Sequence, residues 1–168
     1  MASKPSYIGL LNTIANAERG GHELFKAWSG STKDQELQVT LDMVAVREME
    51  HSWAFEKRLN ELGFSLQPAT TNKQLNKQVR FLKSSASDED KFASLGVGAE
   101  KAKGSTSEDS DGLLQILADK SIDPQTGALM GRFISEERDS GRQLIKAHKA
   151  MLRKKMSKNK KVKLKKRG

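Results

Sequence analysis

Two long segments of the chain repeat apolar residues at steps of three and four, and ionisable side chains interrupt both repeats. The repeat in the first segment consists of Leu11, Ile14, Glu18, His22, Phe25 and Trp28. The repeat in the second segment consists of Leu37, Leu41, Val44, Glu48, His51, Phe55 and Leu59. This spacing predicts two amphipathic helices whose apolar stripes face a core. Because burying an unpaired carboxylate is costly, Glu18 and Glu48 need a compensating proton or metal ion.

The two stripes predict helices over residues 7–28 and 33–62. Ser6 is the expected N-cap of the first helix and Thr32 of the second, because their hydroxyls can accept from free backbone N–H groups. Gly63 fits the position that follows the end of the second helix. At 1.5 Å per residue the helices are about 33 and 45 Å long, and the short connection between them favours antiparallel packing.

The middle of the chain predicts shorter elements. One helix is expected over residues 72–83 and another over residues 88–103, the second capped by Ser87 and weakened by Gly96. The apolar run over residues 113–117 predicts one or two turns of buried helix. These elements are less regular than the two long helices.

The last helix is expected to begin after Asp123, an N-cap candidate, with Pro124 at the first helical position, where its missing N–H costs nothing. Its apolar stripe contains Met130, Phe133, Glu137, Leu144, His148 and Met151. The apolar face is lost after Met156, which predicts a disordered basic tail. We therefore expect a helical domain over residues 1–152 and a basic tail over residues 153–168.

These segments together resemble the ferritin-like superfamily, and rubrerythrin-type proteins most. The matching segments are AERGGHE around Glu18, REMEH around Glu48 and His51, and the run Glu136-Glu137-Arg138-Asp139. That run is similar to the Glu-Glu-Arg-His segment on the fourth helix of rubrerythrin-like proteins. The resemblance covers residues 7–152 and implies an all-α fold, an antiparallel four-helix bundle with a carboxylate-bridged di-iron site. It implies that Glu18 is a terminal ligand, Glu48 a bridge and His51 the imidazole ligand of the first iron.

The second half of the chain departs from this family pattern. Glu136 is followed three positions later by Asp139, and Glu137 by Ser140, so the second Glu-x-x-His motif is missing. Helical periodicity favours Glu137 as the inward residue, whereas motif alignment favours Glu136. A mononuclear site, a dinuclear site with Asp139 as a ligand, and a degenerate site all stay open. A polar core layer without metal is the further alternative.

The residue types indicate iron, with manganese as the alternative metal, because both accept carboxylate oxygen and imidazole nitrogen. By the resemblance, the function is oxidation of Fe(II) or reduction of peroxide or O₂. The chain has no cysteine, which excludes disulfides, thiolate catalysis, iron–sulfur clusters and a rubredoxin-type centre. Electrons are therefore expected from a separate donor.

The net charge of +9 is distributed very unevenly. Of the 30 basic residues, 13 lie between Arg142 and Gly168, where there is no acidic residue; the other 17 are outnumbered by 21 acidic residues. The basic end suits polyanions, nucleic acid first, through counterion release rather than base reading. The candidate polyanion-binding residues are Arg153, Lys154, Lys155, Lys158, Lys160, Lys161, Lys163, Lys165, Lys166 and Arg167.

Two other interpretations of the basic end stay open: contact with an anionic membrane surface, and a solvated tail that binds nothing. The alternative function is therefore a non-catalytic helical bundle that binds nucleic acid or another polyanion through this end. The sequence contains no stretch of transmembrane length and no signal-peptide pattern, which predicts a cytoplasmic protein. We expect a homodimer.

Overall fold

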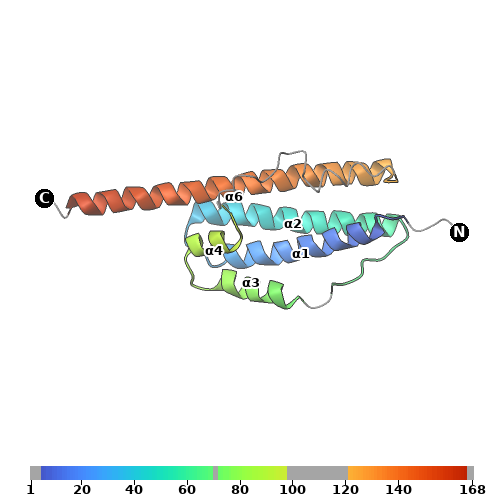
Figure 1. The fold of residues 1–168 in the computed structure, drawn as a ribbon, viewed down its shortest axis with the longest axis horizontal. Helices are drawn as coiled ribbons and strands as arrows, with labels where there is room; N and C mark the ends of the chain where they lie inside the picture. The colour runs from blue at the N-terminus through green and yellow to red at the C-terminus, as the bar shows by residue number, and fades with distance from the viewer. Residues whose placement is uncertain (1–4, 70–71, 98–120, 166–168) are drawn as a thin grey trace, which may run out of the picture.

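The computed structural model describes residues 5–69, 72–97 and 121–165, with side chains as far as residue 157. These residues contain five helices and no strand, which confirms the all-α prediction for the part described (Figure 1). The helices are α1 (Ile8–Ser29), α2 (Gln35–Glu61), α3 (Lys73–Lys83), α4 (Asp88–Ser94) and α6 (Pro124–Lys165). Among these described residues, no helix is both long and apolar enough to cross a membrane.

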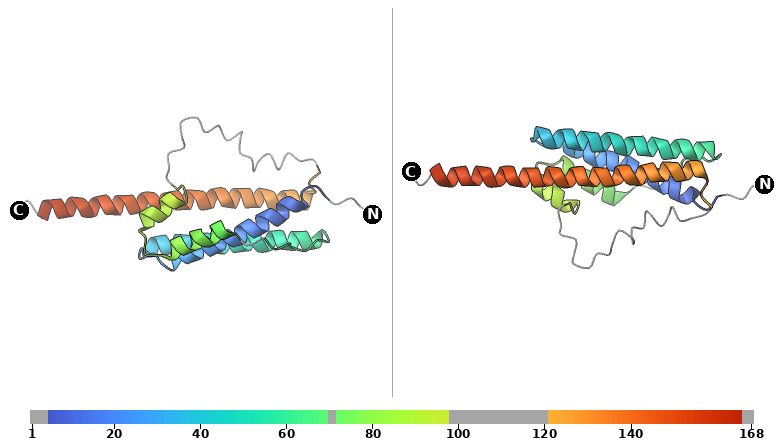
Figure 2. Two further views of the ribbon diagram at one scale, coloured as in Figure 1. Left: turned by 60° about the horizontal axis from the view of Figure 1, so that its bottom comes forward. Right: turned by 90° about the horizontal axis from the view of Figure 1, so that it is seen from above.

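Three long helices form the body of the molecule. Helices α1 and α2 pack side by side in opposite directions, and α6 packs on α2, running parallel to α1 (Figures 1 and 2). Helix α3, with 11 residues, packs on α1, and α4 has only 7 residues. A full-length fourth wall of the expected four-helix bundle is not among the described residues and stays a prediction, and the apolar run 113–117 lies outside them.

The helix ends confirm some of the expected caps and correct others. Ser87 caps α4 by accepting from the Asp90 N–H, and Gly63 has a φ of 83°, a conformation that favours glycine. Ser6 does not cap α1, which begins after Tyr7 without a side-chain cap. Helix α2 is capped by the carboxylate of Asp34 instead of Thr32, because a charged oxygen is the stronger acceptor at a helix N-terminus.

Helix α4 is shorter than the sequence predicts. It ends at Ser94 instead of continuing toward residue 103, and Gly96 follows with a φ of 69°, in the left-handed region that a helix cannot continue through. Beyond residue 97 the expected helix lies outside the described residues.

Two apolar clusters fill the interior and lie on either side of a polar layer. The first cluster contains Tyr7, Ile8, Leu11, Ile14, Ala15, Phe55, Leu59, Met130, Phe133 and Ile134. The second contains Trp28, Leu37, Leu41, Val44, Leu82, Phe92 and Leu144. On each long helix the residues of the polar layer (Glu18; Glu48 and His51; Glu136 and Glu137) come between the residues of the two clusters.

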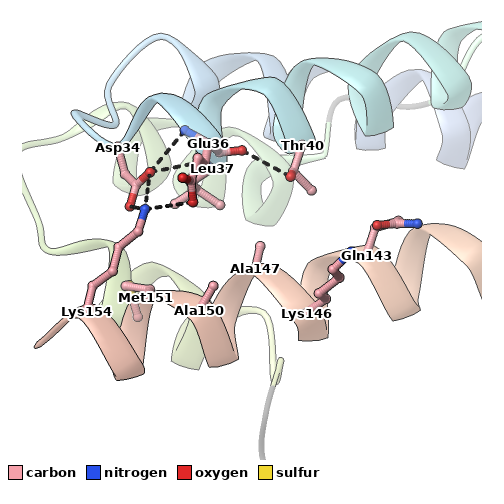
Figure 3. A pocket seen from close by; sticks show the side chains of 10 residues that line it. All are labelled: Asp34, Glu36, Leu37, Thr40, Gln143, Lys146, Ala147, Ala150, Met151 and Lys154. Atoms are coloured by element: carbon pink, nitrogen blue, oxygen red, sulfur yellow. Dashed lines mark hydrogen bonds and ion pairs between the residues drawn. The ribbon is translucent and has the colours of Figure 1, made fainter. Parts of the chain in front are cut away.

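The basic end is not a disordered tail over residues 153–165, because α6 continues as one helix to Lys165 (Figure 2). The sequence from residue 142 to 165 holds no glycine or proline, and lysine and leucine are good helix formers. Lys154 also reaches across to Asp34 and Glu36 (Figure 3). Lys155 pairs with Glu89 of α4.

Arg58 joins the end of α2 to the start of α6. Its buried guanidinium donates to Asp123 Oδ1 at 2.8 Å and its Nε donates to Thr126 Oγ1 at 2.8 Å. Tyr7, just before α1, donates to Asp123 Oδ2 at 2.6 Å. Asp123 also accepts from the N–H groups of Gln125 and Thr126, which confirms it as the N-cap of α6. Burial would raise the pKa of Asp123, but the hydrogen bonds from Thr126 and Tyr7 outweigh burial and lower it.

We predict that Asp123→Ala lowers the free energy of unfolding by about 3 kcal/mol, because the buried Arg58 keeps only Glu61 as a carboxylate partner, Tyr7 loses its acceptor and α6 loses its cap. Asp34→Ala removes a cap from α2 without uncovering a buried charge, so it should cost only about 1 kcal/mol. Urea unfolding followed by circular dichroism measures both. Equal losses in the two variants would contradict the joining role of Asp123.

Candidate metal centre

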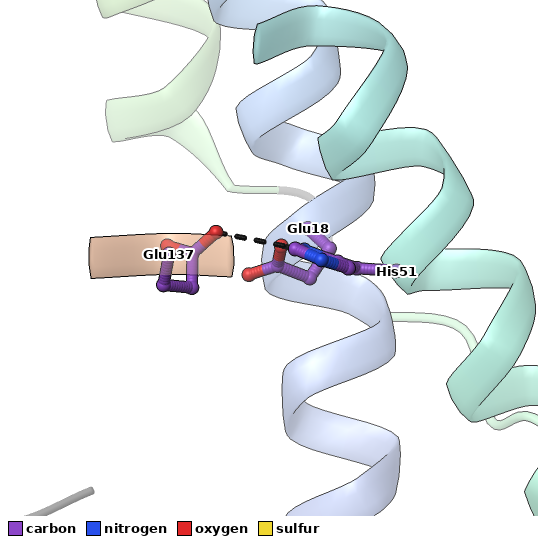
Figure 4. A group of neighbouring side chains, drawn as sticks. All are labelled: Glu18, His51 and Glu137. Atoms are coloured by element: carbon purple, nitrogen blue, oxygen red, sulfur yellow. Dashed lines mark hydrogen bonds and ion pairs between the residues drawn. The ribbon is translucent and has the colours of Figure 1, made fainter. Parts of the chain in front are cut away.

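Side chains from three helices meet in the polar layer. His51 from α2 is 4% exposed and Glu18 from α1 is 7% exposed, and Glu137 from α6 points toward them (Figure 4). His51 Nδ1 lies 3.0 Å from Glu18 Oε2 and 3.5 Å from Glu137 Oε1. One ligand atom of each residue lies within 4.8 Å of the other two, so this group can hold a metal ion.

The two nitrogens of His51 face different carboxylates. While Nδ1 faces Glu18 and Glu137, Nε2 lies 2.8 Å from Glu136 Oε2. The other oxygen of Glu136 accepts from Arg132 Nε at 2.9 Å. Phe133 packs edge-on against the imidazole, with ring centroids 5.1 Å apart, and helps to fix its orientation. The imidazole is therefore held with one nitrogen toward the interior and the other toward the half-buried Glu136.

Glu48 lies against the backbone of α1, where only glycine leaves room for it. A Cβ atom on Gly21 would lie 2.1 Å from Glu48 Oε2. Real side chains do not approach that closely, so any other residue at this position must displace the carboxyl group. Gly21 thus lets the Glu48 carboxyl group approach the backbone of α1 closely.

The buried carboxyl groups shift one another's protonation. Burial and the nearby charges of Glu18 and Glu137 raise the pKa of Glu48 to about 9. Burial also raises the pKa of Glu18, although the hydrogen bond with His51 opposes it. At neutral pH the metal-free site thus holds Glu48 in its neutral form.

His51 shifts in the direction of its charged form. Burial would lower the pKa of His51, but the carboxylates of Glu137, Glu18 and Glu136 outweigh burial and raise it to about 10. Burial would likewise raise the pKa of Glu136, yet the bonds from His51 and Arg132 lower it. One imidazolium therefore compensates the carboxylates around it when no metal is present.

Glu137 Oε1 is a buried atom that has no hydrogen-bond partner among the described residues. Buried polar atoms in folded proteins almost always have a partner, so an orphaned carboxylate oxygen calls for an explanation. The His51 imidazolium lies 3.5 Å away and compensates the charge of this oxygen without a good hydrogen bond, so a cation bound beside His51 Nδ1 and Glu18 would give it a ligand contact. Together with the space that Gly21 leaves for Glu48, this atom makes the donor set suitable for a metal.

Five of the six expected metal ligands converge in this layer: Glu18, Glu48, His51, Glu136 and Glu137. Asp139 pairs instead with Arg47 at 3.1 Å, and with Arg142 at 3.4 Å. His22 bonds through Nδ1 to the Ala45 carbonyl at 2.7 Å, as suits a core histidine rather than a ligand.

Two arginines near the site were not identified from the sequence. Arg47 donates to the Glu136 carbonyl, to Asp139 and to Ser140, and so fixes this turn of α6 against α2. No local sequence pattern predicts this contact, because α2 and α6 are far apart in the chain. The pairing of Arg132 with Glu136 could have been predicted, because the two residues lie four positions apart on one helix.

No protein-family model matches the chain, and neither does any curated protein or solved structure. The ferritin-like resemblance therefore stays an interpretation of the residues themselves. The chemistry of the site has to be argued from its own geometry.

We predict that Gly21→Ala displaces the Glu48 carboxyl group and lowers the amount of metal that the protein retains, while the helical fold persists. Gly9→Ala is the matched control on the same helix, because a Cβ there meets nothing within 4 Å. The control should gain about 0.5–1 kcal/mol from alanine's better helix propensity and keep its metal binding. Elemental analysis and thermal unfolding distinguish the two, and equal metal retention would contradict the role of Gly21.

We predict that the metal-free protein loses stability as the pH rises from about 5 to 9. Folding raises the pKa of Glu48 from 4.5 to about 9 and that of His51 from 6.5 to about 10. The folded state thus holds protons that the unfolded state has released, and the resulting stability is present below pH 4.5 and 6.5 respectively and lost toward the folded values. The slope is at most about 1.4 kcal/mol per pH unit for each group.

Glu48→Gln should reduce that pH dependence, because the amide stays neutral throughout the range. Glu50→Gln changes an exposed residue on the same helix and should leave the dependence as it is. Chemical unfolding of the metal-free variants at several pH values makes the comparison. An unchanged slope in Glu48→Gln would show that the Glu48 carboxyl group ionises normally.

Proposed function

We propose that this protein is a non-haem iron protein that oxidises Fe(II) or reduces peroxide or O₂ at the polar layer between its three long helices. The single observation that carries the proposal is the arrangement of buried carboxyl groups around one imidazole, with Glu137 Oε1 left without a hydrogen-bond partner among the described residues. Manganese is the alternative metal, because it accepts the same donor atoms.

The geometry favours Glu18, His51 Nδ1 and Glu137 as the atoms that would hold the cation. A metal-binding histidine usually donates its other ring N–H to a carboxylate, which orients the ring and strengthens the ligand. His51 Nε2 already faces Glu136 at 2.8 Å. We therefore assign Glu137 as the ligand from α6 and Glu136 as the residue that positions His51.

Glu48 supplies the remaining nearby carboxyl group. In the metal-free site it holds a proton at neutral pH, and a cation placed beside it would favour its ionised form. Glu48 is thus the group expected to release a proton when metal enters. Iron in such a site supplies the change between two oxidation states that electron transfer to peroxide or O₂ requires.

The described residues favour one cation over two. Asp139 is held by Arg47, and Glu89 of α4 pairs with Lys155. No second histidine lies in the polar layer among the described residues, where His22 bonds to a carbonyl and His148 stacks on Phe92. Glu100 and Glu108 lie outside the described residues.

We predict about one iron per chain after anaerobic loading with Fe(II), since one histidine and its carboxylates complete a single site. His51→Ala and Glu137→Gln should lose that iron. Asp139→Asn is the control and should keep it, because Asp139 pairs with Arg47. Elemental analysis gives the stoichiometry, and absorbance changes on adding O₂ or peroxide report oxidation.

The possible outcomes separate the alternatives. About two irons per chain, one of them lost in Asp139→Asn, would support the dinuclear site with Asp139 instead. Retention of neither iron nor manganese would overturn the proposed function and leave a polar core layer held together by protons alone.

A further inference from the structure

Helix α6 carries its positive charges on two sides with different roles. On the side that faces the bundle, Lys154 pairs with Asp34 at 3.0 Å and with Glu36 at 2.8 Å (Figure 3). Lys155 pairs with Glu89. These two lysines attach α6 to α2 and α4. The sequence predicts both as polyanion-binding residues, but in the structure they form ion pairs within the protein.

Another side of α6 carries a row of exposed cations, which we call the outer cationic row: Arg142, Lys146, Lys149 and Arg153. Their spacing of four, three and four residues places them on one face of the helix. Lys146 is at the edge of this row, because it also lines the pocket that contains Asp34, Glu36 and Lys154 (Figure 3). Arg142 contacts Asp139 at 3.4 Å. Among the residues that the structure describes, the other three have no acidic partner. The row covers 12 residues, and its first and last members lie about 17 Å apart along the helix axis.

The like charges of the outer cationic row repel one another and destabilise α6 when nothing is bound to them. Like charges three or four positions apart on a helix destabilise it by about 0.2–0.5 kcal/mol per pair. The outer cationic row contains three such neighbouring pairs and no interleaved acid. A surface built in this way is stabilised when a polyanion neutralises it, which is the electrostatic footprint of nucleic-acid binding.

The row fits a linear array of phosphates better than a membrane surface. Duplex DNA carries one negative charge per about 1.7 Å of its axis, so a straight row of cations meets many phosphates without changing shape. A membrane-binding helix needs a broad apolar face beside its cations. Among the residues of α6 whose side chains the structure describes, the exposed large apolar ones are Ile145 and Met156, which lie about three helical turns apart, and neither is aromatic.

We propose that the outer cationic row docks the protein along the phosphate backbone of duplex nucleic acid, and that this surface begins at Arg142 within the bundle instead of at Arg153. Because α6 is one continuous helix, the row keeps its geometry before binding and little ordering cost is added. Phosphate contacts carry no base information, so binding is independent of sequence and depends strongly on salt.

The test uses the full chain and a fluorescently labelled 25-base-pair duplex DNA, with binding followed by anisotropy at several salt concentrations. The variant R142Q/K146Q/K149Q neutralises three cations of the row. The matched control, K73Q/K77Q/K83Q, removes the same charge from exposed positions on α3, which packs on a different helix. A second control, K154Q/K155Q, removes the two lysines that face the bundle.

The row variant should lose at least tenfold in affinity at 100 mM salt, and its slope of log affinity against log salt should shrink by about 2–3, near 0.9 per lost phosphate contact. The α3 control should change affinity less than about threefold, as a loss of net charge alone would. The K154Q/K155Q variant should leave the slope of log affinity against log salt unchanged. Removing like-charge repulsion should leave the melting temperature of the row variant unchanged or raised, so a loss of binding cannot be attributed to unfolding.

Three results would overturn the proposal. Wild-type protein that does not bind the duplex at low salt would exclude it directly. Equal losses in the row variant and the α3 control would show a non-specific effect of net charge. Stronger, row-dependent binding to vesicles containing 30% phosphatidylserine than to the duplex would assign the surface to an anionic membrane instead.

Discussion

The pairing of one buried imidazole with carboxylates from two other helices determines how the three long helices pack. His51 contacts Glu18 of α1 through one nitrogen and Glu136 of α6 through the other. Apolar clusters lie on both sides of this layer, so a carboxylate that moved along its helix by a turn would enter an environment with no partner. The polar layer thus sets the register of the helices, while the apolar clusters supply most of the favourable free energy.

The acidic residues around this layer fall into two groups according to their cationic partners. Glu136 and Asp139 lie toward the outside of α6 and are held by the permanently charged Arg132 and Arg47. For Glu18 and Glu137, the described residues offer only His51, whose charge is removable. An arginine cannot give way to a metal ion, whereas a proton can. A metal ion can therefore replace the His51 proton that balances the charges of Glu18 and Glu137.

Helical periodicity was enough to identify Glu18, Glu48 and His51, because each interrupts an apolar stripe that must face the core. For α6 periodicity favoured Glu137 and motif alignment favoured Glu136, and both lie beside His51 because residues about 100° apart on a helix can border one wide stripe. The pairing of Arg47 with Asp139 depends on packing between distant segments, which no local pattern records. The loss of the apolar face after Met156 does not end α6, because lysine-rich segments keep a high helix propensity without an apolar stripe.

The continuity of α6 constrains how its length can change. The same 42-residue helix carries Glu137 and Glu136 toward the polar layer and the outer cationic row toward solvent. Inserting or deleting one residue between Glu137 and Arg142 would rotate one set against the other by about 100° and shift it by about 1.5 Å. A change of seven or eleven residues would rotate it by only about 20°. In related chains that keep both surfaces, we therefore expect the segment between Glu137 and Arg142 to have the same length or to differ by seven or eleven residues.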